Sequence, residues 1–140
     1  MRQRVLCDTG PLVALLNRRD QYHNWAKHQF SDIEPPFFTC EPVLAEACFV
    51  LKRGGLQCDS VLRLVRQGDL KIPFRLEDEI DRIEQMVIRY SNVPMDLADA
   101  CMVRLAEQIS GSLVLTLDSD FIIYRMHDRR TIPTVMPTAP

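Results

Sequence analysis

Residues 113–121 read LVLTLDSDF, and this stretch decides which fold to expect. Leu113 to Thr116 has the apolar composition of a buried strand. Two aspartates, Asp118 and Asp120, follow almost directly. A short apolar strand of this kind is typical of a parallel sheet covered on both faces. Carboxylates just beyond its end lie where such sheets bind their ligands.

The N-terminal stretch QRVLCD, over residues 3–8, repeats this arrangement. An apolar strand ends at Asp8, Thr9 and Gly10 form a turn, and Pro11 suits the first position of a helix. Both aspartates therefore end apolar strands. We expect Asp8 and Asp118 to lie at the same edge of one sheet, although they are far apart in the sequence.

Short apolar stretches alternate with helical periodicity along the rest of the chain. Further strands are expected at 37–40, 70–73 and 131–135. Helices are expected from residue 11, near 20–30, from residue 42, and at 57–67, 76–90 and 96–109. Strands that alternate with helices imply an α/β fold with a parallel sheet and helices on both of its faces.

The length and composition indicate an ordinary globular protein. The 140 residues suit a single domain over 1–140, and residues 132–140 are expected to form a loose C-terminal tail apart from the short last strand. No apolar run reaches the roughly 18 residues of a membrane span. Without a secretory signal pattern, we expect a cytoplasmic protein. The 5 cysteines include no CxxC pair and are expected to be reduced and mostly buried.

Two of the expected helices carry further acids. Glu46 lies among small and apolar neighbours in EPVLAEACFVL, which is unusual for a solvated helix face. Asp96 and Asp99 share one face of a helical turn. Simpler interpretations remain open, because Asp8, Asp96 and Asp118 could each cap a helix and Glu46 could be a surface residue.

Several carboxylates at one edge of a sheet repel one another unless a cation lies between them. Mg²⁺ and Mn²⁺ prefer carboxylate oxygens together with water molecules. Two such ions, about 4 Å apart, can activate a water and stabilise the leaving oxygen in phosphodiester cleavage. The acids therefore favour a metal-dependent site for phosphoryl transfer.

Four motifs resemble, in their order and spacing, those of the PIN domain family and especially of its VapC-type toxin ribonucleases. They are DTGPLVALLN at 8–17, EPVLAEA at 41–47, DLADA at 96–100 and LTLDSDF at 115–121. Together they span about residues 5–125. The resemblance implies a three-layer α/β/α sandwich with a parallel sheet of about five strands.

The resemblance also implies a function, which is cleavage of single-stranded RNA by a metal-activated water with one or two Mg²⁺ or Mn²⁺ ions. The acids it marks as catalytic and metal-binding are Asp8, Glu46, Asp99 and Asp118. Further candidates for the metal site are Asp120 and, as auxiliaries, Asp96, Thr9 and Thr116. It implies a homodimer and, for the toxin branch, a cognate antitoxin protein.

The net charge of −2 is unusual for a protein that binds RNA. Basic side chains would have to flank the acids locally and hold phosphates. The candidates are Arg18, Arg19, Lys52 and Arg53, with Arg125, Arg129 and Arg130 beyond them. Each of them could equally be a solvated surface residue. His23 and Trp25 are expected to pack on a helix rather than to bind bases.

Other functions remain open. A housekeeping RNA-processing nuclease would carry the same acids, and a PIN-fold binding or regulatory module would need little or no catalysis. A receiver domain would need a second acid beside Asp8 and a lysine after the last strand. A haloacid-dehalogenase-like phosphatase would need a second acid after Asp8. Neither pattern occurs in the sequence.

The helix at 76–90 is expected to turn its isoleucines and valine inward, although the same face would suit a dimer or an antitoxin. These side chains are Ile80, Ile83, Val87 and Ile88.

Overall fold

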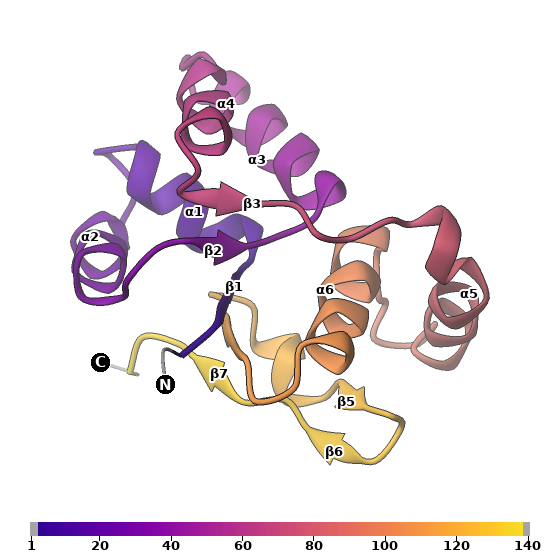
Figure 1. The fold of residues 1–140 in the computed structure, drawn as a ribbon. Coiled ribbons are helices and arrows are strands. Elements are labelled where there is room, and N and C mark those ends of the chain that lie inside the picture. Colours follow the sequence, from indigo (N-terminus) through magenta and orange to yellow (C-terminus); the bar gives the residue numbers. More distant parts are fainter. Residues whose placement is uncertain (1–2, 139–140) are drawn as a thin grey trace.

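The structure is a computed structural model that describes residues 3–138 (Figure 1). Its main sheet has five parallel strands in the order β3-β2-β1-β4-β7. These strands are β1 (Val5–Cys7), β2 (Phe37–Phe38), β3 (Leu70–Lys71), β4 (Leu113–Leu115) and β7 (Thr134–Val135). A separate antiparallel hairpin pairs β5 (Arg125–Met126) with β6 (Arg130–Thr131).

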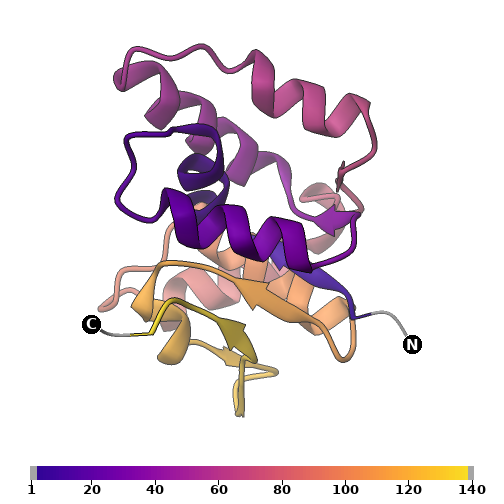
Figure 2. The same cartoon turned by 90° about the vertical axis from the view of Figure 1, so that its left-hand side faces the viewer.

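Helices cover both faces of the sheet (Figures 1 and 2). They are α1 (Thr9–Leu16), α2 (His23–Asp32), α3 (Glu41–Arg53), α4 (Asp59–Arg66), α5 (Ile80–Arg89) and α6 (Leu97–Gln108). Two 3₁₀ helices, η1 (Glu77–Glu79) and η2 (Ser119–Ile122), complete the order.

Side chains alternate across the central strands and divide the core in two. Leu6 and Val114 face a cluster built mainly from α5 and α6. Val5, Cys7 and Leu115 face a second cluster, which α1, α3 and α4 close. Alternation of this kind requires both sheet faces to be covered. The predicted α/β/α sandwich with a five-stranded parallel sheet is confirmed.

Two ends of elements differ from the prediction. The second helix begins at His23 because Asp20 first forms a turn, in which its Oδ1 accepts a hydrogen bond from the Tyr22 backbone N at 2.8 Å. The last strand, expected over residues 131–135, is present as β7, but it begins only at Thr134 because Thr131 belongs to β6; β7 pairs with β4 in the register Val114↔Thr134. Part of the expected C-terminal tail therefore belongs to the sheet, and residues 139–140 lie outside the described residues.

The prediction for α5 was right for Ile83 and wrong for Ile80, Val87 and Ile88. Ile80 and Ile88 are 51% and 68% exposed, whereas Ile83 and Met86 are buried, together with Tyr90 at the end of the helix. The helix packs mainly on α6, so only a narrow stripe of side chains is covered.

Two expectations about single residue types agree with the structure. All five cysteines are free, and Cys7, Cys40 and Cys101 are buried. His23 Nδ1 lies 2.8 Å from the Ala14 carbonyl oxygen, and Trp25 packs against the core.

Over residues 3–138, none of the helices has the length and apolar character that crossing a membrane requires.

Candidate active site

The pairing of β1 with β4 brings Asp8 beside Thr116. Cys7 is the register partner of Leu115, and the Asp8 backbone N donates to the Leu115 carbonyl at 3.0 Å. The Thr116 hydroxyl donates to Asp8 Oδ2 at 2.7 Å, and it accepts a hydrogen bond from the Asp118 backbone N at 2.9 Å. One buried hydroxyl thus holds the first aspartate and the loop that carries Asp118.

Gly10 lets the first turn of α1 approach this loop. A Cβ atom at position 10 would lie 3.0 Å from the Leu117 Cβ, tighter than almost all real contacts of this kind. Leu117 stands between Thr116 and Asp118. A larger residue at position 10 would therefore require Leu117 to shift.

Helix α6 contributes Asp99 and Asp96. Asp96 caps the helix, because its Oδ1 accepts a hydrogen bond from the Asp99 backbone N at 2.8 Å. Asp99 Oδ2 accepts a hydrogen bond from the Tyr124 hydroxyl at 2.8 Å. Asp96 is thus a helix cap and also lies in the wall of the cavity described next.

A cavity of about 430 Å³ lies at the carboxyl edge of the sheet and collects acids from separate elements. Its lining includes the four predicted catalytic acids, with Asp96 and Thr9: Asp8, Thr9, Glu46, Asp96, Asp99 and Asp118. None of the lining contributed by residues 3–138 is lysine or arginine. Thr116 lies beneath this edge, fully buried. Asp120 is not in the lining; its backbone N donates to Asp118 Oδ1 at 2.9 Å.

Three further lining residues were not predicted from the sequence. Asp20, Gln21 and Tyr22, in the loop between α1 and α2, form part of the wall. An Asx turn at Asp20 could have been expected from its residue type, but its closeness to the acids depends on how α2 folds back onto α1.

Burial raises the pKa values of these carboxyl groups, because it disfavours their charged form. It raises the pKa of Asp8 to about 6, an effect that the Thr116 hydrogen bond partly offsets and that the charges of Asp118 and Glu46 increase. Burial likewise raises the pKa of Asp99 to about 7, partly offset by the Tyr124 hydroxyl. The pKa values of Glu46 and Asp118 are raised as well, first by burial and then by neighbouring acids. A cation in the cavity would relieve this penalty.

The donors fit a hard divalent cation. They are carboxylate and hydroxyl oxygens, which Mg²⁺ and Mn²⁺ prefer. Within the described chain, the buried Thr9 Oγ1 has no hydrogen-bond partner, although it lies close enough to Glu46 to counteract part of the rise in that carboxyl's pKa. No group of three Asp, Glu, His or Cys side chains in residues 3–138 is already arranged to hold an ion. Glu46 and Asp118, the other two predicted catalytic acids, are only partly buried.

Four of the predicted basic residues lie at the ends of α1 and α3, and none of them is in the cavity lining. A Cβ atom on Gly54 would be 3.8 Å from Asn17 Nδ2, so the ends of α1 and α3 are neighbours. Next to these ends are the exposed side chains of Arg18, Arg19, Lys52 and Arg53.

The other arginines have different surroundings. The Arg125 guanidinium donates hydrogen bonds to the carbonyl oxygens of Ile122, Ile123 and Tyr124. It therefore stabilises the backbone just before it and is not free to bind a phosphate. Arg129 precedes β6 and Arg130 lies in it, so both belong to the hairpin region rather than to the cavity. The sequence could not distinguish these arginines, because only the fold decides what each one faces.

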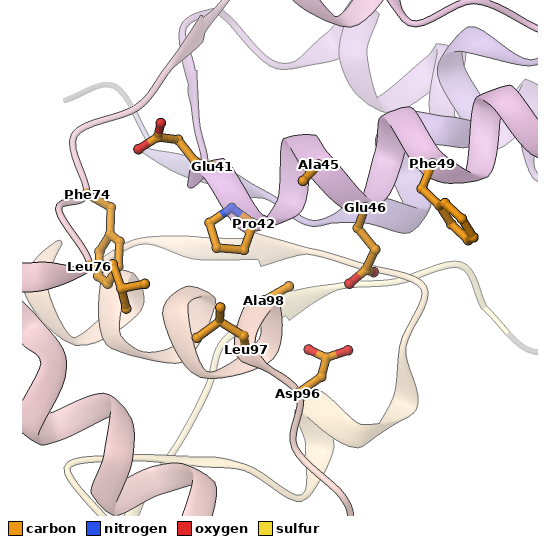
Figure 3. A pocket seen from close by; sticks show the side chains of 10 residues that line it. All are labelled: Glu41, Pro42, Ala45, Glu46, Phe49, Phe74, Leu76, Asp96, Leu97 and Ala98. Atoms are coloured by element: carbon orange, nitrogen blue, oxygen red, sulfur yellow. The ribbon is translucent and has the colours of Figure 1, made fainter.

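A second hollow, of about 710 Å³, adjoins the acidic cavity and shares Glu46 and Asp96 with it. Figure 3 shows these two carboxylates pointing toward each other between α3 and α6. The remaining wall is largely apolar and includes Phe49, Phe74 and Leu97. Phe49 is 61% exposed.

Fold and site together define an α/β protein with an acidic cavity at the carboxyl edge of a parallel sheet. Residues 5–125 match the PIN domain family, and the chain belongs to this family, as its motifs predicted. Its fold is similar to the crystal structure of Mycobacterium tuberculosis VapC20, which is described as a toxin that cleaves the sarcin–ricin loop. The TM-score is 0.73 at 19% sequence identity, over 83% of this chain and 91% of that chain. None of the curated proteins matches the sequence.

Proposed function

We propose that this protein is a metal-dependent endoribonuclease that cleaves single-stranded RNA and acts as the toxin of a toxin–antitoxin pair. The observation that carries the proposal is the cavity in which Asp8, Glu46, Asp99 and Asp118 meet without a lysine or arginine in the described lining. Membership of the PIN domain family and the similarity in fold to VapC20 support it.

Each side chain has a role in this proposal. Bound Mg²⁺ or Mn²⁺ would activate a water and neutralise charge on the phosphate. Asp8 and Asp99, which are buried and held by hydroxyl groups, would bind one or two ions together with Glu46. Asp118, which is more accessible, would orient the attacking water and accept its proton. The four basic residues near the ends of α1 and α3 would hold phosphates of the RNA.

Cleavage of a mixed single-stranded RNA by the purified protein tests the activity directly. We expect cutting with Mg²⁺ or Mn²⁺, none with EDTA, and none by the Asp99→Asn variant with either metal. Cutting that persists in EDTA would contradict metal dependence. Full activity of the variant would remove Asp99 from the site.

The attacking group is tested by the products. If water attacks, the cleaved ends are a 3′-hydroxyl and a 5′-phosphate, because the RNA 2′-hydroxyl is not used. An RNA with a single 2′-deoxy sugar beside the cleaved phosphate should therefore be cut at a similar rate. A 2′,3′-cyclic phosphate product, or complete resistance of the deoxy substrate, would contradict the proposed mechanism.

Partners follow from the same proposal. We infer a homodimer and an antitoxin protein that binds the toxin, and a cytoplasmic location, where the RNA substrate would be found. The apolar hollow beside the acids and the exposed Ile80 and Ile88 of α5 supply surface for such contacts. Light scattering of the purified chain would give the mass of a dimer; a monomer at high concentration would contradict the first inference.

A further inference from the structure

We propose that Tyr124 is a positioning residue of the active site. Its hydroxyl fixes one oxygen of Asp99, so that the other oxygen is left for the metal ion. This inference rests on the proposed metal-dependent function and assigns a role to a residue that the sequence motifs do not include.

The contact is direct and buried. Tyr124 is 0% exposed, and its hydroxyl donates to Asp99 Oδ2 at 2.8 Å. Asp99 itself is 8% exposed and lines the acidic cavity. A buried phenol needs a hydrogen-bond partner, and here that partner is a carboxylate of the site and not a backbone carbonyl.

The same arrangement occurs at the other buried aspartate. The Thr116 hydroxyl donates to Asp8 Oδ2 at 2.7 Å. In both cases a neutral hydroxyl donates a hydrogen bond to one of the two carboxylate oxygens. A lysine or arginine at these positions would have supplied the positive charge itself and would compete with a bound cation. A hydroxyl fixes the direction of the carboxylate and leaves its negative charge for the ion.

The Tyr124 ring is held from two sides. It packs edge-on against Tyr90, with the ring centroids 5.2 Å apart, and against Phe121, with the centroids 5.3 Å apart. These two ring contacts leave the Tyr124 hydroxyl little freedom to follow a moving carboxylate, so it determines where Asp99 Oδ2 lies. The Tyr90 hydroxyl takes no part in them; it accepts a hydrogen bond from the Arg125 backbone N at 3.0 Å.

Tyr124 also connects two elements that carry acids. It follows η2, whose N-terminal cap is Asp118, and it reaches across to Asp99 on α6. The Arg125 guanidinium braces the same segment through three carbonyl oxygens. The hydrogen bond from Tyr124 therefore helps to set the position of Asp99 relative to Asp118, two residues far apart in the sequence.

The test is the affinity of the purified protein for Mn²⁺, measured by calorimetry without RNA. Tyr124→Phe keeps the ring and removes the hydroxyl, and we expect about tenfold weaker binding, as is usual for the loss of a group that orients a metal ligand. Tyr90→Phe is the matched control. It removes a buried hydroxyl from the same aromatic cluster without touching Asp99, and its affinity should stay within about twofold of the wild type.

The outcomes separate this inference from the function it rests on. Unchanged Mn²⁺ affinity in Tyr124→Phe, with normal binding by the wild type, would overturn the role of Tyr124 and leave the nuclease proposal intact. Equal losses in both variants would show general packing and would also overturn it. A wild-type protein that binds no Mn²⁺ would overturn both proposals together.

NMR of the wild-type protein provides a second test, which needs no substituted variant. With ¹³C-labelled tyrosine, Mg²⁺ is expected to shift the Cζ resonance of Tyr124, because its hydroxyl partner becomes a metal ligand. The Cζ resonance of Tyr90 should shift much less. Equal or absent shifts at the two tyrosines upon saturation with Mg²⁺ would contradict the inference.

Discussion

Replacing Asp8 with asparagine is expected to abolish RNA cleavage and, at the same time, to make the metal-free protein more stable at neutral pH. Loss of a group that merely orients a metal ligand costs roughly 10–100-fold in affinity or activity, so loss of a ligand itself should cost more than about 100-fold in cleavage rate.

The gain in stability follows from the burial of Asp8, which is 5% exposed. Its pKa rises from 3.8 in the unfolded chain to about 6 in the folded protein, mainly through burial. Because the folded state holds this proton more tightly, the contribution of Asp8 to stability falls as the pH rises from about 4 to about 6, and it stays low above that. The rise corresponds to roughly 3 kcal/mol against the charged form. Asparagine removes this penalty but makes a weaker hydrogen bond with Thr116.

We therefore expect the free energy of unfolding of Asp8→Asn to exceed that of the wild type by about 1–3 kcal/mol at pH 7.5 in EDTA, and by much less at pH 4. Urea denaturation at both pH values measures this difference. Saturating Mg²⁺ should shrink it at pH 7.5, because the ion stabilises only the wild-type site. If the variant were less stable than the wild type at pH 7.5, Asp8 would stabilise the folded state, and the prediction would be wrong.

Replacing Glu107 with alanine should have the largest destabilising effect. The Glu107 side chain is 0% exposed and accepts hydrogen bonds from Arg82 at 2.7 Å and from Arg104 at 3.1 Å. Arg82 in turn pairs with Asp128 at 3.2 Å, in the turn between β5 and β6. The acid therefore ties α5, α6 and the hairpin together, and its removal leaves two arginines without their shared partner.

Arg82 keeps Asp128 and Arg104 keeps Glu79, so the deletion removes charge-assisted hydrogen bonds without leaving an unpaired charge, and we expect Glu107→Ala to lose about 2–3 kcal/mol in free energy of unfolding at pH 7. Burial alone would raise the pKa of Glu107, but hydrogen bonds from Arg82, the His127 backbone N and Arg104 outweigh it, so the pKa is lowered. The stabilisation is therefore complete above a pH of about 4.5, the ordinary value, and is lost as the pH falls through the lowered pKa.

Urea denaturation of Glu107→Ala between pH 7 and pH 3 measures both the size of the loss and its decline in acid. Asp78→Ala is a suitable control, because its pair with Arg75 is exposed and should contribute less than about 1 kcal/mol. Equal stabilities of the two variants would mean that the buried network contributes no more than a surface ion pair.

The sequence alone determined the parallel sheet and most of the acidic site. Asp8 directly follows one apolar strand and Asp118 comes three residues after the end of another, and parallel strands bring such residues to one edge of the sheet. Glu46 and Asp99 were recognisable because small or apolar neighbours surround them within local motifs. These signals are local, so they can be recognised without knowing the fold.

The tertiary structure decided everything that depends on contacts between remote segments. Nothing near Tyr124 in the sequence reveals that it reaches Asp99, or that Arg125 binds carbonyls and not phosphate. The exposure of Ile80 and Ile88 depends on how much of α5 is covered by α6, and periodicity cannot fix this. Hydrophobic patterns record which side chains avoid water, but the partner of a buried hydroxyl or guanidinium is set only when the helices pack against the sheet.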